Sequence, residues 1–255
     1  MNDLFNLTGR VALVTGGSRG LGKAMARGFA EAGADLVISS RHEDELRRAA
    51  AELADGTGVR VECLVADMTS RAEAQRLADE ALALMGRVDI LVNNAGSNKP
   101  QAIDLITDAD WDRLVELNLS SCMALTRALA PQMKARRWGR VIHISSIMGF
   151  GSKEGRNVYS ATKAALIGMA KASALDLGPF GITVNCIAPG PFLTDLPLSV
   201  FTMEQQQAIA DRTALGRWGE PRELAGTALL LASEAGAYIT GETIVVDGGA
   251  LCKTI

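Results

Sequence analysis

Cysteine and histidine are scarce in this 255-residue chain. All six residues of these two types are far apart in the sequence: Cys63, Cys122, Cys186, Cys252, His42 and His143. Zinc sites use closely spaced pairs of such residues, so the sequence predicts no metal site. The cysteines instead fit the use of small buried hydrophobic residues in a reducing compartment.

Long hydrophobic runs and an excess of one charge are also absent. No apolar stretch is long enough to cross a bilayer, and the start MNDLFNLTGR lacks the basic residues and cleavage site of a secretory signal. The net charge is -3, which gives no electrostatic reason to bind nucleic acid or an anionic membrane. We therefore expect a cytoplasmic protein with neither of these partners.

Short apolar runs alternate with helical patterns along the whole chain. The runs are VALVTG (11–16), DLVISS (35–40), VECLVAD (61–67), DILVNNAG (89–96), RVIHISS (140–146), ITVNCIAPG (182–190) and TIVVDGG (243–249). Nearly continuous β-branched runs suit strands buried on both faces, so the order predicts a parallel sheet with helices on both sides. No linker interrupts residues 1–255, so we expect one domain, with the irregular stretch 191–217 as a candidate substrate lid.

A glycine-rich turn follows the first predicted strand and precedes a helix expected from Lys23. Its residues are Gly16, Gly17, Ser18, Arg19, Gly20, Leu21 and Gly22. Glycines allow a tight turn and close approach of a pyrophosphate, which a helix N-terminus attracts. The motif alone also fits a plain strand-to-helix connection or a mononucleotide P-loop. Ala24 argues against a P-loop phosphotransferase, because that loop needs Ser or Thr there to hold magnesium.

Tyr159 and Lys163 are four residues apart in a predicted long helix, so their side chains share one face. A free phenol titrates near pH 10, and a neighbouring ammonium stabilises its phenolate form. Lys163 would therefore help Tyr159 to act as an acid and base. Taken alone, a Tyr and a Lys at this spacing are more often part of an amphipathic helix face than a catalytic pair. Ser146 closes the fifth predicted strand, whereas Ser145 should face the other way.

Three motifs together resemble the short-chain dehydrogenase/reductase family. They are T-G-x-x-x-G-x-G from Thr15, N-N-A-G from Asn93 and Tyr159-x-x-x-Lys163. The resemblance covers essentially the whole chain and implies a single-domain, Rossmann-like, doubly wound parallel seven-stranded α/β sheet. It further implies that Ser146 hydrogen-bonds the substrate oxygen, that Tyr159 transfers the proton, and that Asn118 holds a water linked to Lys163.

The same resemblance implies a dinucleotide site. Besides the glycine-rich turn, Tyr159 and Lys163, its members would be Arg41, Asp67, Met68, Asn93, Ala95, Gly96, Pro189, Gly190 and Thr194. Taken without the family, Asn93 fits a turn, Asp67 fits a helix N-cap and Pro189 fits a strand terminator.

The end of the second predicted strand favours NADP(H) over NAD(H) as the cofactor. An NAD site usually places an acid there for the ribose, whereas this chain has Ser39, Ser40 and Arg41. The guanidinium groups of Arg19 and Arg41 would suit a 2′-phosphate, although both residues also fit solvated surface charges.

Within the family, the N-terminus and the stretch 212–221 are similar to gluconate 5-dehydrogenases, and most of the rest is shared with 3-oxoacyl-carrier-protein reductases. We therefore expect hydride transfer between NADP(H) and a small carbonyl or secondary alcohol, with a sugar acid favoured. Lys153, Arg156 or Arg212 could pair with its carboxylate. A catalytically inactive cofactor-binding sensor is the alternative from another class.

A 3-oxoacyl-carrier-protein reductase, the alternative within the family, would use different substrate-binding residues. Arg136 and Arg137 would form a basic patch for an acidic carrier, and Leu196, Leu198, Val200 and Phe201 would accept an acyl chain. The family resemblance also implies a homotetramer, assembled through the helices around 109–135 and 159–178 and through the C-terminal strand.

Overall fold

Each predicted apolar run forms a strand in one sheet. The computed structural model describes residues 2–194 and 202–252. The strands are β1 Val11–Thr15, β2 Asp35–Ser40, β3 Val61–Val65, β4 Ile90–Asn93, β5 Gly139–Ile144, β6 Ile182–Pro189 and β7 Thr243–Val246. Every pairing is parallel and the order is β3-β2-β1-β4-β5-β6-β7. The predicted α/β fold class is thereby confirmed.

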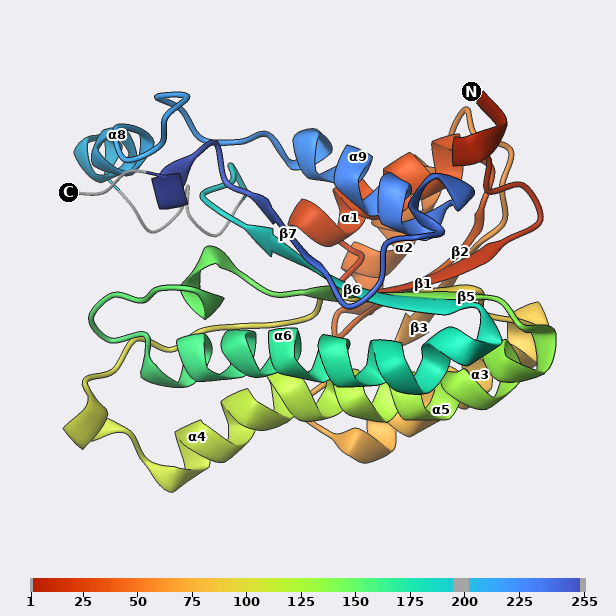
Figure 1. The fold of residues 1–255 in the computed structure, drawn as a ribbon, viewed down its shortest axis with the longest axis horizontal. Coiled ribbons are helices and arrows are strands. Elements are labelled where there is room, and N and C mark those ends of the chain that lie inside the picture. The colour runs from red at the N-terminus through yellow and green to blue at the C-terminus, as the bar shows by residue number, and fades with distance from the viewer. Residues whose placement is uncertain (1, 195–201, 253–255) are drawn as a thin grey trace.

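Helices cover both faces of the sheet. They are α1 Gly20–Glu31, α2 Glu43–Ala54, α3 Arg71–Met85, α4 Asp108–Val115, α5 Ser121–Arg136, α6 Asn157–Leu177, α8 Met203–Ala210 and α9 Pro221–Ala232. Helices α1, α2 and α9 lie on one face, and α3, α5 and α6 lie on the other (Figure 1). In the described part of the chain, no helix is long and apolar enough to span a membrane.

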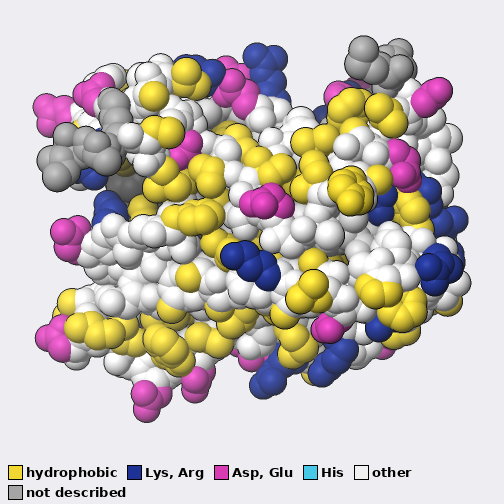
Figure 2. Space-filling model, in the orientation of Figure 1, with side chains coloured by type: hydrophobic (Ala, Val, Ile, Leu, Met, Phe, Trp, Pro, Cys, Tyr) yellow, Lys and Arg dark blue, Asp and Glu magenta, His cyan; other side chains and the backbone are white. Residues whose placement is uncertain are grey.

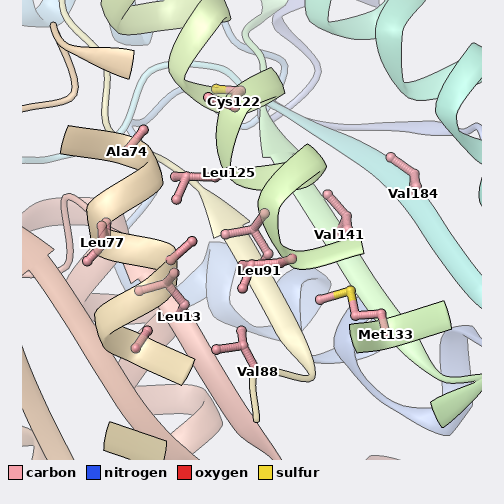
Figure 3. Close-up of a cluster of buried hydrophobic side chains, with 14 of the residues drawn as sticks. Leu13, Ala74, Leu77, Val88, Leu91, Cys122, Leu125, Met133, Val141 and Val184 are labelled. Atoms are coloured by element: carbon pink, nitrogen blue, oxygen red, sulfur yellow. The ribbon is translucent and has the colours of Figure 1, made fainter. Parts of the chain in front are cut away.

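Two apolar layers hold the helices to the sheet. One joins strand residues such as Leu13 and Leu91 to α3, α5 and α6 (Figure 3). The other joins Val14 and Ile38 to α1, α2 and α9. Successive strand residues point to opposite faces, so a strand buried on both sides has to be apolar at nearly every position. This requirement explains why the strands could be found as continuous apolar runs.

Some boundaries differ from the sequence prediction. Helix α1 begins at Gly20 rather than Lys23, because the amide of Lys23 already donates to the carbonyl of Arg19, at 3.2 Å. Strand β5 ends at Ile144, so Ser145 and Ser146 lie just beyond it. The stretch 191–217 contains the regular helix α8. Four residues of the candidate lid, Leu196, Leu198, Val200 and Phe201, lie outside the described residues.

The strand order places the candidate site. The chain builds β1 to β3 outward in one direction and then returns to place β4 on the other side of β1. Ligands of open α/β sheets bind beyond the carboxyl ends of the strands at this switch point. The glycine-rich turn follows β1 and the N-N-A-G motif follows β4, so both lie there.

Candidate active site

The glycine-rich turn leaves no room for side chains at two positions. A Cβ on Gly22 would lie 2.2 Å from the carbonyl oxygen of Gly16, and a Cβ on Gly17 would lie 2.9 Å from the Ile38 side chain. Gly16 has φ of +64°, a conformation that favours glycine. Close packing of backbone on backbone therefore requires glycine in this turn.

Asn94 and Thr15 bind the turn to the end of β4. The Asn94 carboxamide donates to the carbonyls of Thr15 (2.9 Å) and Gly16 (3.2 Å). The Thr15 hydroxyl accepts from the amides of Asn94 and Ala95, both at 3.0 Å. These four hydrogen bonds fix the distance between the two loops that flank the switch point.

The N-terminus of α1 is suited to an anion. Its N-cap, Arg19, makes no side-chain capping hydrogen bond, and the first amides of a helix have no acceptor within the helix. Such amides and the helix dipole attract phosphate. Arg19 and Arg41 are exposed, and no hydrogen bond or ion pair engages either side chain within the described part of the chain. This end of the site therefore offers unpaired positive charge.

The side chains of Asp67 and Asn93 are already engaged. Asp67 Oδ1 accepts from the amide of Thr69 at 2.9 Å, and Ser70, rather than Asp67, caps α3. The Asn93 carboxamide points into the core, where its Nδ2 lies 3.0 Å from Nδ1 of His143 and 3.4 Å from the Thr126 hydroxyl. Met68 is buried. Any contact between Asn93 and a cofactor would accordingly come from its backbone.

Lys163 is fixed beside Tyr159 on α6. Its ammonium donates to the carbonyl oxygen of Ile144 at 2.7 Å and lies 5.5 Å from the centre of the Tyr159 ring. The lysine is 4% exposed, whereas Tyr159 is half-buried. Gly96 faces this pair, because a Cβ there would lie 3.4 Å from Lys163 Nζ and 3.2 Å from Asn118 Oδ1. The phenol, the ammonium and Asn118 therefore belong to one site.

Asn118 owes its position to an irregular helical turn. Residues Glu116–Ser120 form a single π-helical turn between α4 and α5, and such turns are frequent at functional sites. Asn118 Oδ1 accepts from the amide of Ser97 at 2.9 Å, and its Nδ2 donates to the Ser97 carbonyl, also at 2.9 Å, and to the Thr162 hydroxyl at 3.3 Å. The turn thus connects the loop after β4 to the residue that precedes Lys163.

Two serines beyond β5 have different partners. Ser145 donates its hydroxyl hydrogen to the Lys163 carbonyl at 2.8 Å, which ties the loop to α6. Ser146 Oγ accepts from the amide of Met148 at 3.1 Å. Because Ser146 is the acceptor in that bond, its own hydroxyl hydrogen is left available for another oxygen.

The segment after β6 reaches the glycine-rich turn. The Gly190 amide donates to the carbonyl of Val246 at 2.9 Å, and a Cβ on Gly190 would lie 2.6 Å from the backbone of Asp247. A Cβ on Gly20 would lie 3.4 Å from the methyl carbon of Thr194. Residues after β1, β4, β5 and β6 thus surround one region at the carboxyl edge of the sheet.

A row of polar side chains crosses the sheet beneath this region. Asn93, His143, Cys186 and Thr243 are register partners on β4, β5, β6 and β7. Burial, together with the charge of Lys163, lowers the pKa of His143 to about 4, so its imidazole is neutral at pH 7. Burial raises the pKa of Cys186 to about 12, which keeps its thiol protonated.

Two of the predicted cations lie elsewhere. Arg136 is 3.6 Å from the buried carboxylate of Asp89, and Arg137 donates to the carbonyl of Pro179 at 3.0 Å. Both lie near the amino ends of the strands, at the edge opposite Tyr159. Arg212 is exposed after α8. By contrast, Lys153 and Arg156 occupy the loop that leads into α6, and Arg156 forms a β-bridge with Gln101.

Comparison with known proteins gives matches over nearly the whole chain. A family model described as enoyl-(acyl carrier protein) reductase matches residues 16–250. The 3-oxoacyl-[acyl-carrier-protein] reductase FabG of Aquifex aeolicus (strain VF5) is 37% identical over 243 residues, covering 95% of this chain and 98% of that protein.

Solved structures agree closely with this one. A gluconate 5-dehydrogenase from Burkholderia cenocepacia J2315, in complex with NADP and tartrate, has a TM-score of 0.93 and 37% identity over 99% of both chains. A 3-oxoacyl (acyl-carrier-protein) reductase from Agrobacterium tumefaciens C58 with NADP bound has a TM-score of 0.93 and 33% identity, covering 98% of this chain and 97% of that chain. The chain belongs to the short-chain dehydrogenase/reductase family and is an oxidoreductase that acts on CH–OH or carbonyl groups with NAD(P).

Proposed function

We propose that this enzyme transfers a hydride between NADP(H) and a small carbonyl or secondary alcohol, with Tyr159 as the acid and base. The observation that carries the proposal is the buried Lys163 ammonium, held at 2.7 Å by the Ile144 carbonyl beside the Tyr159 ring. A structural lysine has no need of a phenol on the same helix face. This pairing favours an enzyme over a cofactor-binding sensor.

The protein's part in the reaction is to position the substrate and move a proton. When bound, the nicotinamide supplies or accepts the hydride. In reduction, the Tyr159 hydroxyl gives its proton to the carbonyl oxygen, and in oxidation it takes the proton back. The free hydroxyl hydrogen of Ser146 donates to the same oxygen, and Lys163 stabilises the phenolate. The second lone pair of Asn118 Oδ1 is the proposed acceptor for a water linked to Lys163.

The dinucleotide fits the observed groups. The glycine cradle and the uncapped amides of α1 suit a pyrophosphate, with Gly96, Lys163, Pro189, Gly190 and Thr194 toward the nicotinamide end. Arg19 and Arg41 offer guanidinium groups for a 2′-phosphate, and strand β2 ends in serine rather than an acid. Two solved relatives contain bound NADP. These points support NADP(H) over NAD(H).

Cofactor choice can be tested by comparing kcat/KM with NADPH and with NADH. We expect the wild type to prefer NADPH, and Arg41→Ala to lower the NADPH value about tenfold while leaving the NADH value unchanged, because a charge-assisted pair is lost. Arg47→Ala, on the exposed face of α2, is the matched control. A wild-type preference for NADH would refute the assignment.

For the substrate, we propose a small hydroxy or keto acid such as a sugar acid. Lys153 and Arg156 lie in the loop between Ser146 and Tyr159, where they could pair with a carboxylate. A solved relative described as a gluconate 5-dehydrogenase contains tartrate. The second candidate is a 3-oxoacyl thioester, which the names of other relatives favour. Against it, Arg136 is engaged with Asp89 at the opposite edge of the sheet.

A direct comparison separates the two substrates. The purified enzyme would be given 5-ketogluconate or a 3-oxoacyl thioester with NADPH, and absorbance loss would be followed. We expect turnover of the keto acid. Efficient turnover of the thioester with none of the keto acid would eliminate the sugar-acid proposal.

We also propose a homotetramer. Exposed apolar side chains gather over the region of α4 (Figure 2). Leu105, shortly before α4, is 65% exposed, and Leu175, near the end of α6, is 80% exposed. Strand β7 is an edge of the sheet. Sedimentation that shows only monomer would contradict this assembly.

A further inference from the structure

The loop between β4 and α4, residues 97–107, here called the loop wall, is bonded both to Asn118 and to the segment that precedes Tyr159. At its start, Ser97 is held through both its amide and its carbonyl by Asn118. Further along, the Gln101 amide donates to the Gly155 carbonyl at 3.0 Å, and Asn157 Nδ2 donates to the Gln101 carbonyl at 3.2 Å. Gln101 is therefore attached to the segment that ends two residues before Tyr159.

Asp110 is the residue on which this loop converges. Its Oδ2 accepts from Lys99 Nζ at 2.5 Å, from Gln101 Nε2 at 3.1 Å and from the Thr107 hydroxyl at 3.1 Å. The side chain is 16% exposed. These hydrogen bonds, led by the one from Lys99, hold the pKa of Asp110 below its usual range. The carboxylate consequently stays ionised and engaged at neutral pH.

These contacts exceed what helix capping requires. Thr107 caps α4, since its hydroxyl accepts from the Asp110 amide at 3.2 Å. A helix cap needs only residues next to the helix start. Asp110 also reaches Lys99 and Gln101, which are eleven and nine positions earlier in the chain. Two of its three donors therefore belong to the loop wall rather than to the cap.

Two buried acceptors of the loop wall have no partner among the described residues. The carboxamide oxygens of Asn98 and Gln101 are buried and have no hydrogen-bond donor within 2–194 and 202–252. Such acceptors would suit substrate hydroxyls or a bridging water.

We propose that Asp110 is a positioning residue that clamps loop 97–107 against segment 155–157 and thereby sets the shape of the substrate pocket. The inference rests on the proposed function for the location of the substrate beside Tyr159. Asp110 acts through Gln101 and Lys99. Its loss should weaken substrate binding more than it slows the chemical step, and the cofactor cradle on the far side of the site should be unaffected.

The test compares Asp110→Ala and Asp110→Asn with Asp112→Ala, an exposed acid on the same helix. Kinetics would use NADPH and whichever of 5-ketogluconate or a 3-oxoacyl thioester the wild type reduces, and amide hydrogen exchange would be followed in loop 97–107 and segment 155–157. For Asp110→Ala we expect KM to rise about tenfold, equivalent to about 1.4 kcal/mol, with kcat within about threefold and NADPH affinity unchanged. Exchange should accelerate in both segments together.

The variant Asp110→Asn distinguishes loss of the clamping hydrogen bonds from loss of the negative charge. Asp110→Asn keeps a carboxamide oxygen that can accept from Gln101 and Thr107, so its KM should stay close to the wild-type value. Asp112→Ala should match the wild type. Gln101→Ala leaves α4 and its cap intact and should reproduce the faster exchange, which keeps the test decisive even if Asp110→Ala fails to fold.

Several results would overturn the proposal. Unchanged KM and unchanged exchange in folded Asp110→Ala or Gln101→Ala would refute the clamp while leaving the proposed function intact. A fall in kcat with KM unchanged would refute it as well. If the wild type reduces neither carbonyl, both proposed substrates are wrong, and the exchange measurements still decide whether Asp110 joins the two segments.

Discussion

Acid should destabilise this protein through His143. The imidazole is buried on β5, with Asn93 beside it, Cys186 as its register partner on β6, and the charge of Lys163 of α6 acting on it. Its pKa is lowered from 6.5 to about 4 by burial and by the Lys163 charge. At a pH between these two pKa values, the imidazole binds a proton in the unfolded chain but stays neutral in the folded chain. The stability contribution is therefore complete above about pH 6.5 and is lost as the pH falls toward 4.

The two pKa values set the size of the effect. Between pH 7 and pH 5 they predict a loss of about 2 kcal/mol in the free energy of unfolding. Urea unfolding at both pH values, at one protein concentration, would measure it in the wild type and in His143→Gln, with His42→Gln as the exposed control. We expect His143→Gln to lose about 2 kcal/mol less than the wild type on acidification. An equal loss in the two proteins would refute the account of His143 as a buried neutral base.

Two further predictions concern the cradle and the amino edge of the sheet. Gly22→Ala should lower the free energy of unfolding by at least about 1–3 kcal/mol and weaken NADPH binding, because its Cβ would lie 2.2 Å from the Gly16 backbone. Gly226→Ala, in open space on α9, should instead raise the free energy of unfolding by about 0.5–1 kcal/mol. Calorimetry measures both outcomes, and equal effects would contradict the packing argument. Asp89→Asn should cost about 3–5 kcal/mol in urea unfolding, because its buried carboxylate accepts from Val11 and Arg87; a cost below about 1 kcal/mol would contradict this.

The sheet and the proximity of Tyr159 and Lys163 could be predicted because their signals are local. Strands buried on both faces are apolar at nearly every position, so β1 appears as a nearly continuous apolar run. Gly22 is required by the carbonyl of Gly16, only six residues earlier in the chain. Tyr159 and Lys163 lie four apart on one helix, so their proximity follows from helix geometry.

The remaining features depend on contacts that sequence spacing does not reveal. The π turn at Glu116–Ser120 inserts one residue into an otherwise regular helical pattern, too little to change its periodicity. Asn93 and Asn94 are adjacent and point to opposite sides, and only Asn94 has its carboxamide on the glycine-rich turn. Arg136 fitted a docking patch in the sequence because its partner, Asp89, is far away in the chain. Asp110 was missed for the same reason.

Turnover by Tyr159→Phe is the most direct test of the assigned chemistry. The change removes the hydroxyl and keeps the ring, so the fold and NADPH affinity should be preserved. With a carbonyl that the wild type reduces, NADPH oxidation should slow by about 10²–10⁴-fold, the usual contribution of a positioned acid. A folded Tyr159→Phe enzyme that binds NADPH and turns over at nearly the wild-type rate would contradict the role of Tyr159 as proton donor.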